Sequence, residues 1–199
     1  NAAIQVIELP TMTQVAEWCH NKTPVEGQIR VMREILKEID QYGAKEIYWT
    51  VENNSIGEAA LVVIRDTGEE NFPGNFLHDP IKVQGKRGRK GFHTSSKSKL
   101  DGCITLKRFI EQDKIKLFSD ACIRELKTFV ARGNSFSAQP GETDDLVMSL
   151  VICCRMITYI ASFEDDIFEV VNQNIGGDNK YDDDKPIDEY DEPMPIGLL

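Results

Sequence analysis

The sequence predicts an α/β fold in which a sheet is flanked by helices. A chain of 199 residues with 41% hydrophobic residues is long enough for one packed domain. Segments with strand-like alternation take turns along the chain with segments that repeat hydrophobic residues every three or four positions. Residues 46–51 are almost continuously apolar, as are strands that helices cover on both faces. We therefore expect one domain with one core.

The first predicted elements are two strands and a helix. Residues 2–9 and 13–20 alternate hydrophobic and polar side chains on either side of Pro10, which predicts an antiparallel pair. From residue 25 to residue 42 the hydrophobic residues fall on one helical face, and Gly43 can supply a left-handed C-terminal cap.

The next strand and helix place a carboxylate between them. The strand "EIYWTV" (46–51) ends at Glu52. The segment "NNSIGEAALVVIRD" (53–66) has the pattern of a helix whose start Asn54 or Ser55 can cap. Glu52 is therefore expected at the carboxyl end of a buried strand, directly before a helix.

The second half begins with a basic segment. Residues 80–94, "PIKVQGKRGRKGFHT", are basic and punctuated by glycine, which predicts a projecting hairpin. The remaining predicted elements are a helix over 97–113, a short strand over 115–118, a helix over 120–130, a short edge strand over 134–138 and a helix over 144–162.

The formal charge of −10 is unevenly distributed. Residues 164–199 hold twelve acidic residues and two lysines, so the rest of the chain has 21 acidic and 21 basic residues. We expect 164–199 to be a flexible acidic tail that either keeps the protein soluble or mimics DNA. The segment from Lys82 to Arg108 contains nine basic residues and one acidic residue, Asp101. This local basic patch favours a phosphate-bearing partner.

Three carboxylates are predicted at the carboxyl end of a strand or at the start of a helix, the places where functional groups of α/β sheets usually lie. In "GETDDLVMSL", Asp144 and Asp145 precede an apolar helix, and Glu52 ends a strand, so these side chains are expected to converge. Clustered carboxylates repel one another unless a divalent cation neutralises them, and oxygen ligands favour Mg²⁺ or Mn²⁺. Two such ions ~4 Å apart would support phosphodiester hydrolysis. The structural alternative is that Thr143, Asp144 or Asp145 caps the helix and compensates its dipole, and that Glu52 bonds loop amides.

Several other function classes lack their signatures. The cysteines and histidines show no zinc-ligand spacing, and neither a GxSxG nor a Walker sequence is present. No stretch approaches the ~18–20 apolar residues that cross a bilayer, and the first ten residues lack a basic flank. We expect a cytosolic protein without a zinc, serine-nucleophile or ATP site.

Three segments carry a resemblance to a known family. In order and spacing, "YWTVENNSIGEAAL", "SKSKLDGCITLKRFIEQDKIKL" and "GETDDLVMSLVI" resemble the C-terminal nuclease domain of the large terminase subunit of tailed bacteriophages. The resemblance implies an RNase H-like mixed sheet flanked by helices over residues 1–163. It also implies a metal-dependent endonuclease that cuts concatemeric double-stranded DNA, with Mg²⁺ or Mn²⁺ and two ions in the intact site.

Matching positions assign roles by this resemblance. Glu52 and Asp145 would be catalytic metal ligands, and Asp144 a supporting catalytic carboxylate. Lys97 and Lys99 match a basic stretch that the family places near DNA. The hairpin would lie along the duplex with Lys86, Arg87, Arg89 and Lys90.

The sequence departs from the family pattern at its start. The family's first catalytic aspartate lies on a strand before the one that matches residues 2–9, and Glu8 is at the wrong place to replace it. We therefore expect these 199 residues alone to form an incomplete metal site and a sheet that is open in its middle.

The resemblance also implies partners and a place of action. These are double-stranded DNA, the N-terminal ATPase domain of the same subunit, the portal ring and the small terminase subunit, at the procapsid portal in the host cytoplasm. Two alternatives remain open: a Holliday-junction resolvase or integrase of the same fold, and a DNA-binding or portal-binding module without catalysis.

Overall fold

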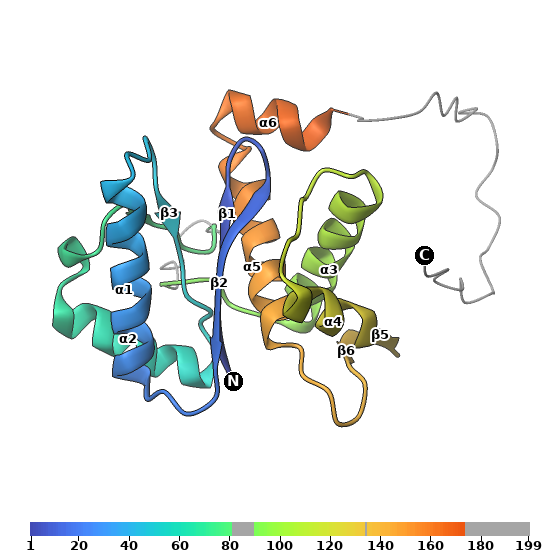
Figure 1. Cartoon of the computed structure of the whole chain (residues 1–199), viewed down its shortest axis with the longest axis horizontal. Helices are drawn as coiled ribbons and strands as arrows, with labels where there is room; N and C mark the ends of the chain where they lie inside the picture. Colours follow the sequence, from blue (N-terminus) through green and yellow to red (C-terminus); the bar gives the residue numbers. More distant parts are fainter. Residues whose placement is uncertain (81–89, 134, 174–199) are drawn as a thin grey trace.

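The computed structural model describes residues 1–80, 90–133 and 135–173. Over these ranges the protein is mixed α/β, about half helical, with six α-helices and three two-stranded sheets (Figure 1). The helices are α1 (Val25–Gln41), α2 (Ser55–Thr67), α3 (Ser96–Glu111), α4 (Asp120–Thr128), α5 (Asp145–Ile160) and α6 (Asp165–Asn172).

The strands form pairs. β1 (Ala2–Glu8) and β2 (Thr13–His20) are the predicted antiparallel pair. The other pairs are β3 (Tyr48–Trp49) with β4 (Asn75–Phe76), which is parallel, and β5 (Phe129–Arg132) with β6 (Ser135–Ala138), which is antiparallel.

The predicted α/β class is confirmed, whereas one continuous sheet is not seen in the described ranges. There β1 and β3 belong to separate sheets, because β1 pairs only with β2 and β3 only with β4. Two isolated bridges extend the pairs: Thr13 with Lys116, and Glu52 with Phe92. β4 and β5 were not predicted, because each is too short to show a periodic pattern.

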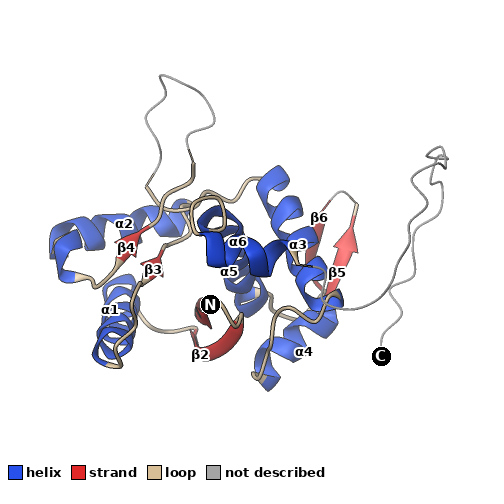
Figure 2. Cartoon of the chain, turned by 90° about the horizontal axis from the view of Figure 1, so that it is seen from above, coloured by secondary structure: helices blue, strands red, loops and turns tan. Residues whose placement is uncertain are grey.

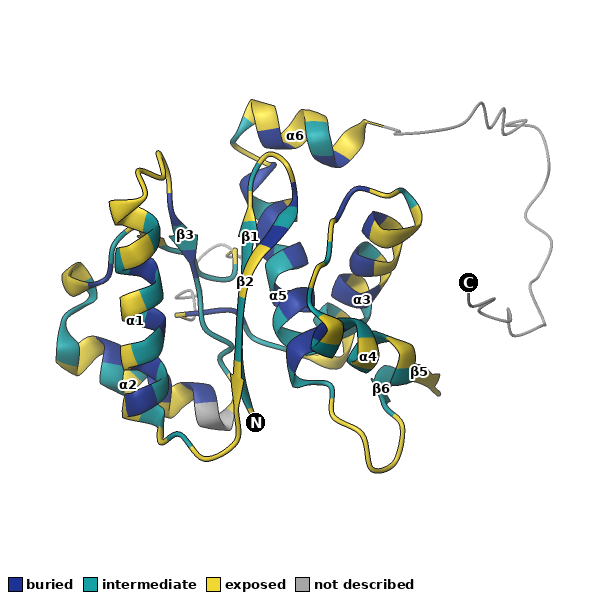
Figure 3. Ribbon diagram, in the orientation of Figure 1, coloured by how far each residue is buried: buried dark blue, intermediate teal, exposed yellow. Residues whose placement is uncertain are grey.

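Helix α5 forms the centre of the larger core. Its residues Val147, Leu150, Val151 and Cys154 are at most 1% exposed, and Figure 3 shows the helix largely buried between β1 and α3. In α3, a Cβ at Gly102 would lie 2.7 Å from a Val151 methyl group, so the glycine allows these helices to approach closely. An apolar helix with no polar face fits this central place.

A second core lies between β3 and the helices α1 and α2. Trp49 stacks on Phe76 with ring centroids 4.1 Å apart and contacts Phe72. Side chains on the other face of β3, such as Tyr48, pack toward α5 together with Leu77. Figure 2, seen from above, shows β3 and β4 between these helical layers. The buried strand is thus covered on both faces, as its apolar sequence predicts.

The packed part of the chain extends beyond residue 163. The sequence predicts an acidic tail from residue 164, but 165–172 form α6, whose Ile167 and Val171 are buried against the larger core. The buried Lys114 donates a hydrogen bond to the Val171 carbonyl, and burial lowers the pKa of this lysine. In the described ranges no single helix is long and apolar enough to cross a membrane, and α5 and α6 reach that length only together, across a bend of 119°.

Candidate functional site

Glu52 lies at the carboxyl end of an extended segment that begins with β3. The Val51 carbonyl accepts a hydrogen bond from the Phe92 N–H at 2.9 Å, and the Asn53 N–H donates to the Phe92 carbonyl at 2.8 Å. These two bonds flank Glu52 and fix it beside Phe92 in a parallel bridge. The structure therefore places Glu52 at the strand end that the sequence predicts.

Asn54 connects Glu52 to the start of α2. Its side-chain oxygen accepts a hydrogen bond from the Gly57 N–H at 2.9 Å, which makes Asn54 the predicted cap. Its side-chain nitrogen donates to Glu52 Oε2 at 2.7 Å and so orients the carboxylate. A Cβ at Gly57 would lie 1.6 Å from the Glu52 carbonyl oxygen, so only glycine permits this approach. The segment "ENNSIG" is thus one strand-to-helix unit.

The start of α5 is capped by a residue from another helix. Glu125 of α4 accepts hydrogen bonds through Oε2 from the N–H groups of Leu146 at 2.8 Å and Val147 at 3.2 Å. Asp144 occupies the N-cap position but makes no side-chain capping bond. The capping interpretation of Asp144 and Asp145 is therefore wrong, because Glu125 satisfies these N–H groups. Asp145 retains a favourable place near the positive end of the helix dipole.

Both aspartates are partly exposed and contact other groups. Asp145 accepts a 2.8 Å hydrogen bond from the Asn1 side chain. Asp144 accepts a 3.4 Å hydrogen bond from the Ala138 N–H and lies 4.0 Å from the Lys99 ammonium. The pKa of the nearby Cys19 thiol is raised by burial first and also by the charges of Asp145 and Glu125. The carboxylates of Asp145 and Glu125 are thus close enough to the Cys19 thiol for their charges to act on it.

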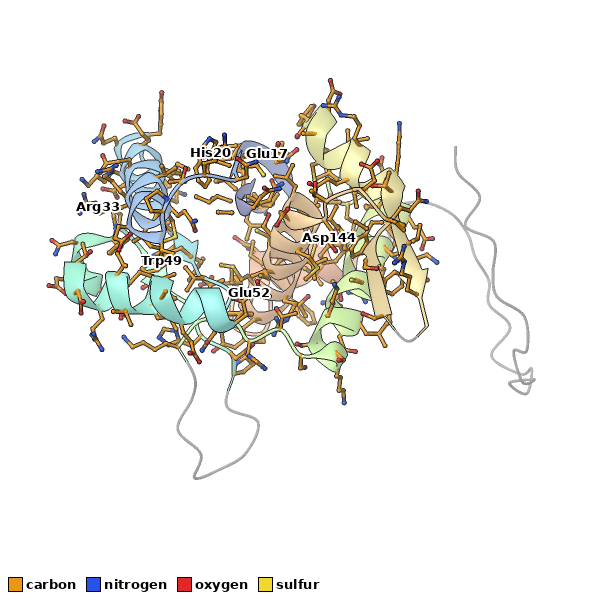
Figure 4. All side chains as sticks on the ribbon, turned by 90° about the horizontal axis from the view of Figure 1, so that it is seen from below. Glu17, His20, Arg33, Trp49, Glu52 and Asp144 are labelled. Carbon is orange, nitrogen blue, oxygen red and sulfur yellow. The ribbon has the colours of Figure 1, made fainter. Side chains whose placement is uncertain are left out.

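The donor atoms suit a hard divalent cation, but the described residues do not complete its site. Carboxylate oxygens are the ligands that Mg²⁺ and Mn²⁺ prefer. However, residues 1–80, 90–133 and 135–173 contain no group of three or more His, Cys, Asp or Glu side chains that could hold a metal ion. Figure 4 shows Glu52 and Asp144 on separate elements, and the contacts of Glu52 run to Asn54 and those of Asp145 to Asn1.

The predicted DNA-binding residues differ in their surroundings. Lys97 is exposed in the first turn of α3, which Ser95 caps. Lys99 is partly buried near Asp144 and lies 5.8 Å from the centre of the Phe129 ring. Lys90 forms an ion pair with Glu69. The other three predicted contacts, Lys86, Arg87 and Arg89, lie outside the described residues.

Sequence reasoning missed Glu125, Asp79 and Arg155. Glu125 gave no signal, because it lies 20 residues before the helix that it caps. Arg155 did give one, since it is the only basic residue in the apolar helix α5. A charge buried in such a helix requires a partner, and Arg155 finds it in Asp79 at 2.7 Å.

We compared the sequence with models of known protein families, and none matches. The family expected from the three quoted segments therefore stays a prediction. The geometry of the Glu52 strand end and of the start of α5 is the structural basis for a proposal.

Proposed function

We propose that this chain is the nuclease domain of a viral DNA-packaging terminase, which hydrolyses double-stranded DNA with Mg²⁺ or Mn²⁺. The observation that carries the proposal is the position and bonding of two carboxylates, Glu52 and Asp145. Glu52 ends a parallel strand with its side chain oriented by Asn54. Asp145 opens α5 without capping it, because Glu125 does so. A carboxylate that has no capping task is available as a ligand.

We also propose that an RNase H-like sheet forms when a further strand joins β1 to β3. In the described residues, the edge of β1 away from β2 makes no strand pairing, and neither does the edge of β3 away from β4. Buried residues of α5 pack with Ala3 and Ile7 of β1 and with Tyr48 of β3, so one helix underlies both edges. The added strand would satisfy both sets of backbone groups and carry the first catalytic aspartate that the family resemblance implies.

Each residue then has a defined task. The ions, when bound, supply an activated water and offset the charge that develops on the phosphate. Asn54 orients the Glu52 carboxylate through its hydrogen bond. Glu125 caps α5, which leaves the Asp145 carboxylate available as a ligand. Lys97 binds a phosphate of the DNA backbone. The proposed partners are DNA, the ATPase domain of the same subunit, the portal ring and the small terminase subunit, in the host cytoplasm at the procapsid portal.

The test is nicking of supercoiled plasmid in millimolar Mn²⁺ or Mg²⁺. With the further strand present, we would compare the wild-type protein with Glu52→Gln, Asp145→Asn and the control Glu142→Gln, which changes an exposed acid close to the site. We expect metal-dependent nicking by the wild type and the control, and a loss of about 100-fold or more in the other two, because each removes a ligand. Nicking that survives both substitutions would contradict the proposal.

Two further outcomes separate the alternatives. Cleavage restricted to four-way junctions would favour a resolvase of the same fold. Salt-dependent DNA binding without nicking in either metal would favour a binding module without catalysis.

A further inference from the structure

Arg155 of α5 contacts two parts of the chain beside Glu52. Its Nη2 donates to Asp79 Oδ1 at 2.7 Å, and its Nη1 donates to the His93 carbonyl at 3.2 Å. The side chains of Arg155 and Asp79 are 15% and 24% exposed, so water screens the pair only in part. Arginine suits this place because its planar fork donates in two directions at once.

Asp79 extends the connection across the strand end. Its second oxygen, Oδ2, accepts a hydrogen bond from the His93 N–H at 2.6 Å, and its own N–H donates to the Gly91 carbonyl at 3.0 Å. His93 Nδ1 lies 2.9 Å from the Asn53 carbonyl, and since a carbonyl only accepts, Nδ1 donates this hydrogen bond. The contacts therefore run from Arg155 to the residue that follows Glu52.

Phe92 provides a second connection between α5 and Glu52. The ring is 2% exposed and packs with Ile152 and Met156 of α5. The Arg155 guanidinium lies 5.1 Å from the ring centre. The backbone of Phe92 bonds to Val51 and Asn53, the neighbours of Glu52. A movement of Phe92 relative to α5 would therefore move Glu52.

We propose that Arg155 is a positioning residue that fixes the strand end carrying Glu52 relative to α5, the helix that begins with Asp145. The inference rests on the proposed function, because it assigns the spacing of the two carboxylates to this contact. Residues 145 and 155 lie about 15 Å apart along one rigid helix. Asp145 is therefore part of α5, and the Glu52 strand end is held against the same helix through Arg155. A misplacement of a catalytic group by ~1 Å can reduce a rate about 100-fold.

The experiment compares Arg155→Gln, Arg155→Lys, Asp79→Asn and the double variant Arg155→Gln/Asp79→Asn. Arg155→Lys keeps the charge but not the two-direction fork. The control Ile167→Val removes one methyl group between α6 and the core, and so lowers stability without touching the contact. The first readout is plasmid nicking, separated into kcat and the KM for DNA. The second is amide hydrogen exchange at Asn53 and Phe92.

We expect Arg155→Gln to lower kcat about 100-fold with KM within about threefold of wild type. Exchange at Asn53 and Phe92 should rise about tenfold. Arg155→Lys should have a kcat and an exchange rate between those of wild type and Arg155→Gln. The double variant should have a kcat no lower than that of Arg155→Gln. Ile167→Val should behave as wild type in both readouts.

The two proposals fail in different ways. An active wild type with an Arg155→Gln variant of unchanged kcat overturns the positioning role and leaves the nuclease intact. An inactive wild type overturns the nuclease and with it the catalytic meaning of the contact. In that case unchanged exchange in Arg155→Gln would further show that the contact does not fix the strand end.

Discussion

The helices α2 and α5 both have a capping type of residue, Asn54 or Asp144, before their first turn, but their first backbone N–H groups are capped in different ways. At α2, Asn54 caps the helix from three residues before Gly57 and also bonds the Glu52 carboxylate. At α5, the carboxylate at the N-cap position, Asp144, does not cap, and Glu125 reaches in from α4.

The difference separates local from tertiary capping. A local cap is readable from sequence, and here it also orients the carboxylate before it. A tertiary cap releases the residues at the helix start for other tasks, which here are Asp144 and Asp145. The following predictions, from the largest expected effect to the smallest, test whether the two helix starts differ in this way.

Gly57→Ala should have the largest effect on stability. Alanine in a helix usually stabilises by ~1 kcal/mol relative to glycine. Here the added Cβ would lie 1.6 Å from the Glu52 carbonyl oxygen, so the strand end or α2 must move. We expect a loss of about 3 kcal/mol in urea unfolding. Gly27→Ala is the control, because its Cβ would meet side-chain atoms alone, a Thr23 methyl group at 2.7 Å and the Pro24 ring at 3.6 Å. Equal effects of the two substitutions would show that the close approach at Glu52 is not required.

Glu125→Ala should destabilise the protein by about 2 kcal/mol, since it removes a charged cap with bonds to two backbone N–H groups of α5. Asn54→Ala should cost ~1 kcal/mol. Asp144→Ala should remain within about 0.5 kcal/mol of wild type. The same unfolding measurement ranks all three. If Asp144→Ala proves the most damaging, the capping task belongs to Asp144 after all.

Lys97→Ala should reduce the salt dependence of DNA binding more than Lys99→Ala does. Lys97 is exposed, whereas Lys99 lies near Asp144 and Phe129. One lost phosphate contact lowers the slope of log K against log salt by ~0.9. Fluorescence anisotropy with duplex DNA at several salt concentrations measures it. Equal slopes for wild type and Lys97→Ala would remove this lysine from the DNA interface.

Asp145→Asn should make the Cys19 thiol somewhat more reactive. Burial raises the pKa of this thiol, and the negative charges of Asp145 and Glu125 raise it further. Removal of the Asp145 charge shifts the pKa down, so more thiolate is present at a given pH and alkylation is faster. The pH profile of iodoacetamide labelling at Cys19 measures this, with Glu142→Gln as control. A profile that does not move would show that the aspartate is too far away to act.

Local patterns made much of the fold predictable. The β1–β2 pair, α1, α2 with its Asn54 cap, and α3 to α5 all follow from periodicity and capping residues. The strand end at Glu52 followed in the same way. These features depend on residues within one turn or one strand of each other.

What the sequence did not reveal depends on distant contacts. The cap from Glu125 and the Arg155–Asp79 pair join residues 21 and 76 positions apart. α6 was assigned to the tail because its acidic residues masked a helical face with Ile167 and Val171. In the described residues β1 and β3 belong to separate sheets, and this depends on which strands pair along the chain and not on the pattern of either strand.

Thermal unfolding with and without Mn²⁺ tests most directly whether Asp145 is a metal ligand. We would compare wild type, Asp145→Asn, Glu52→Gln and Glu142→Gln. We expect Asp145→Asn to unfold near wild type without metal, and millimolar Mn²⁺ to raise the Tm of wild type and Glu142→Gln only. A wild type whose Tm does not respond to Mn²⁺, or an Asp145→Asn variant that responds as strongly as wild type, would contradict the ligand role.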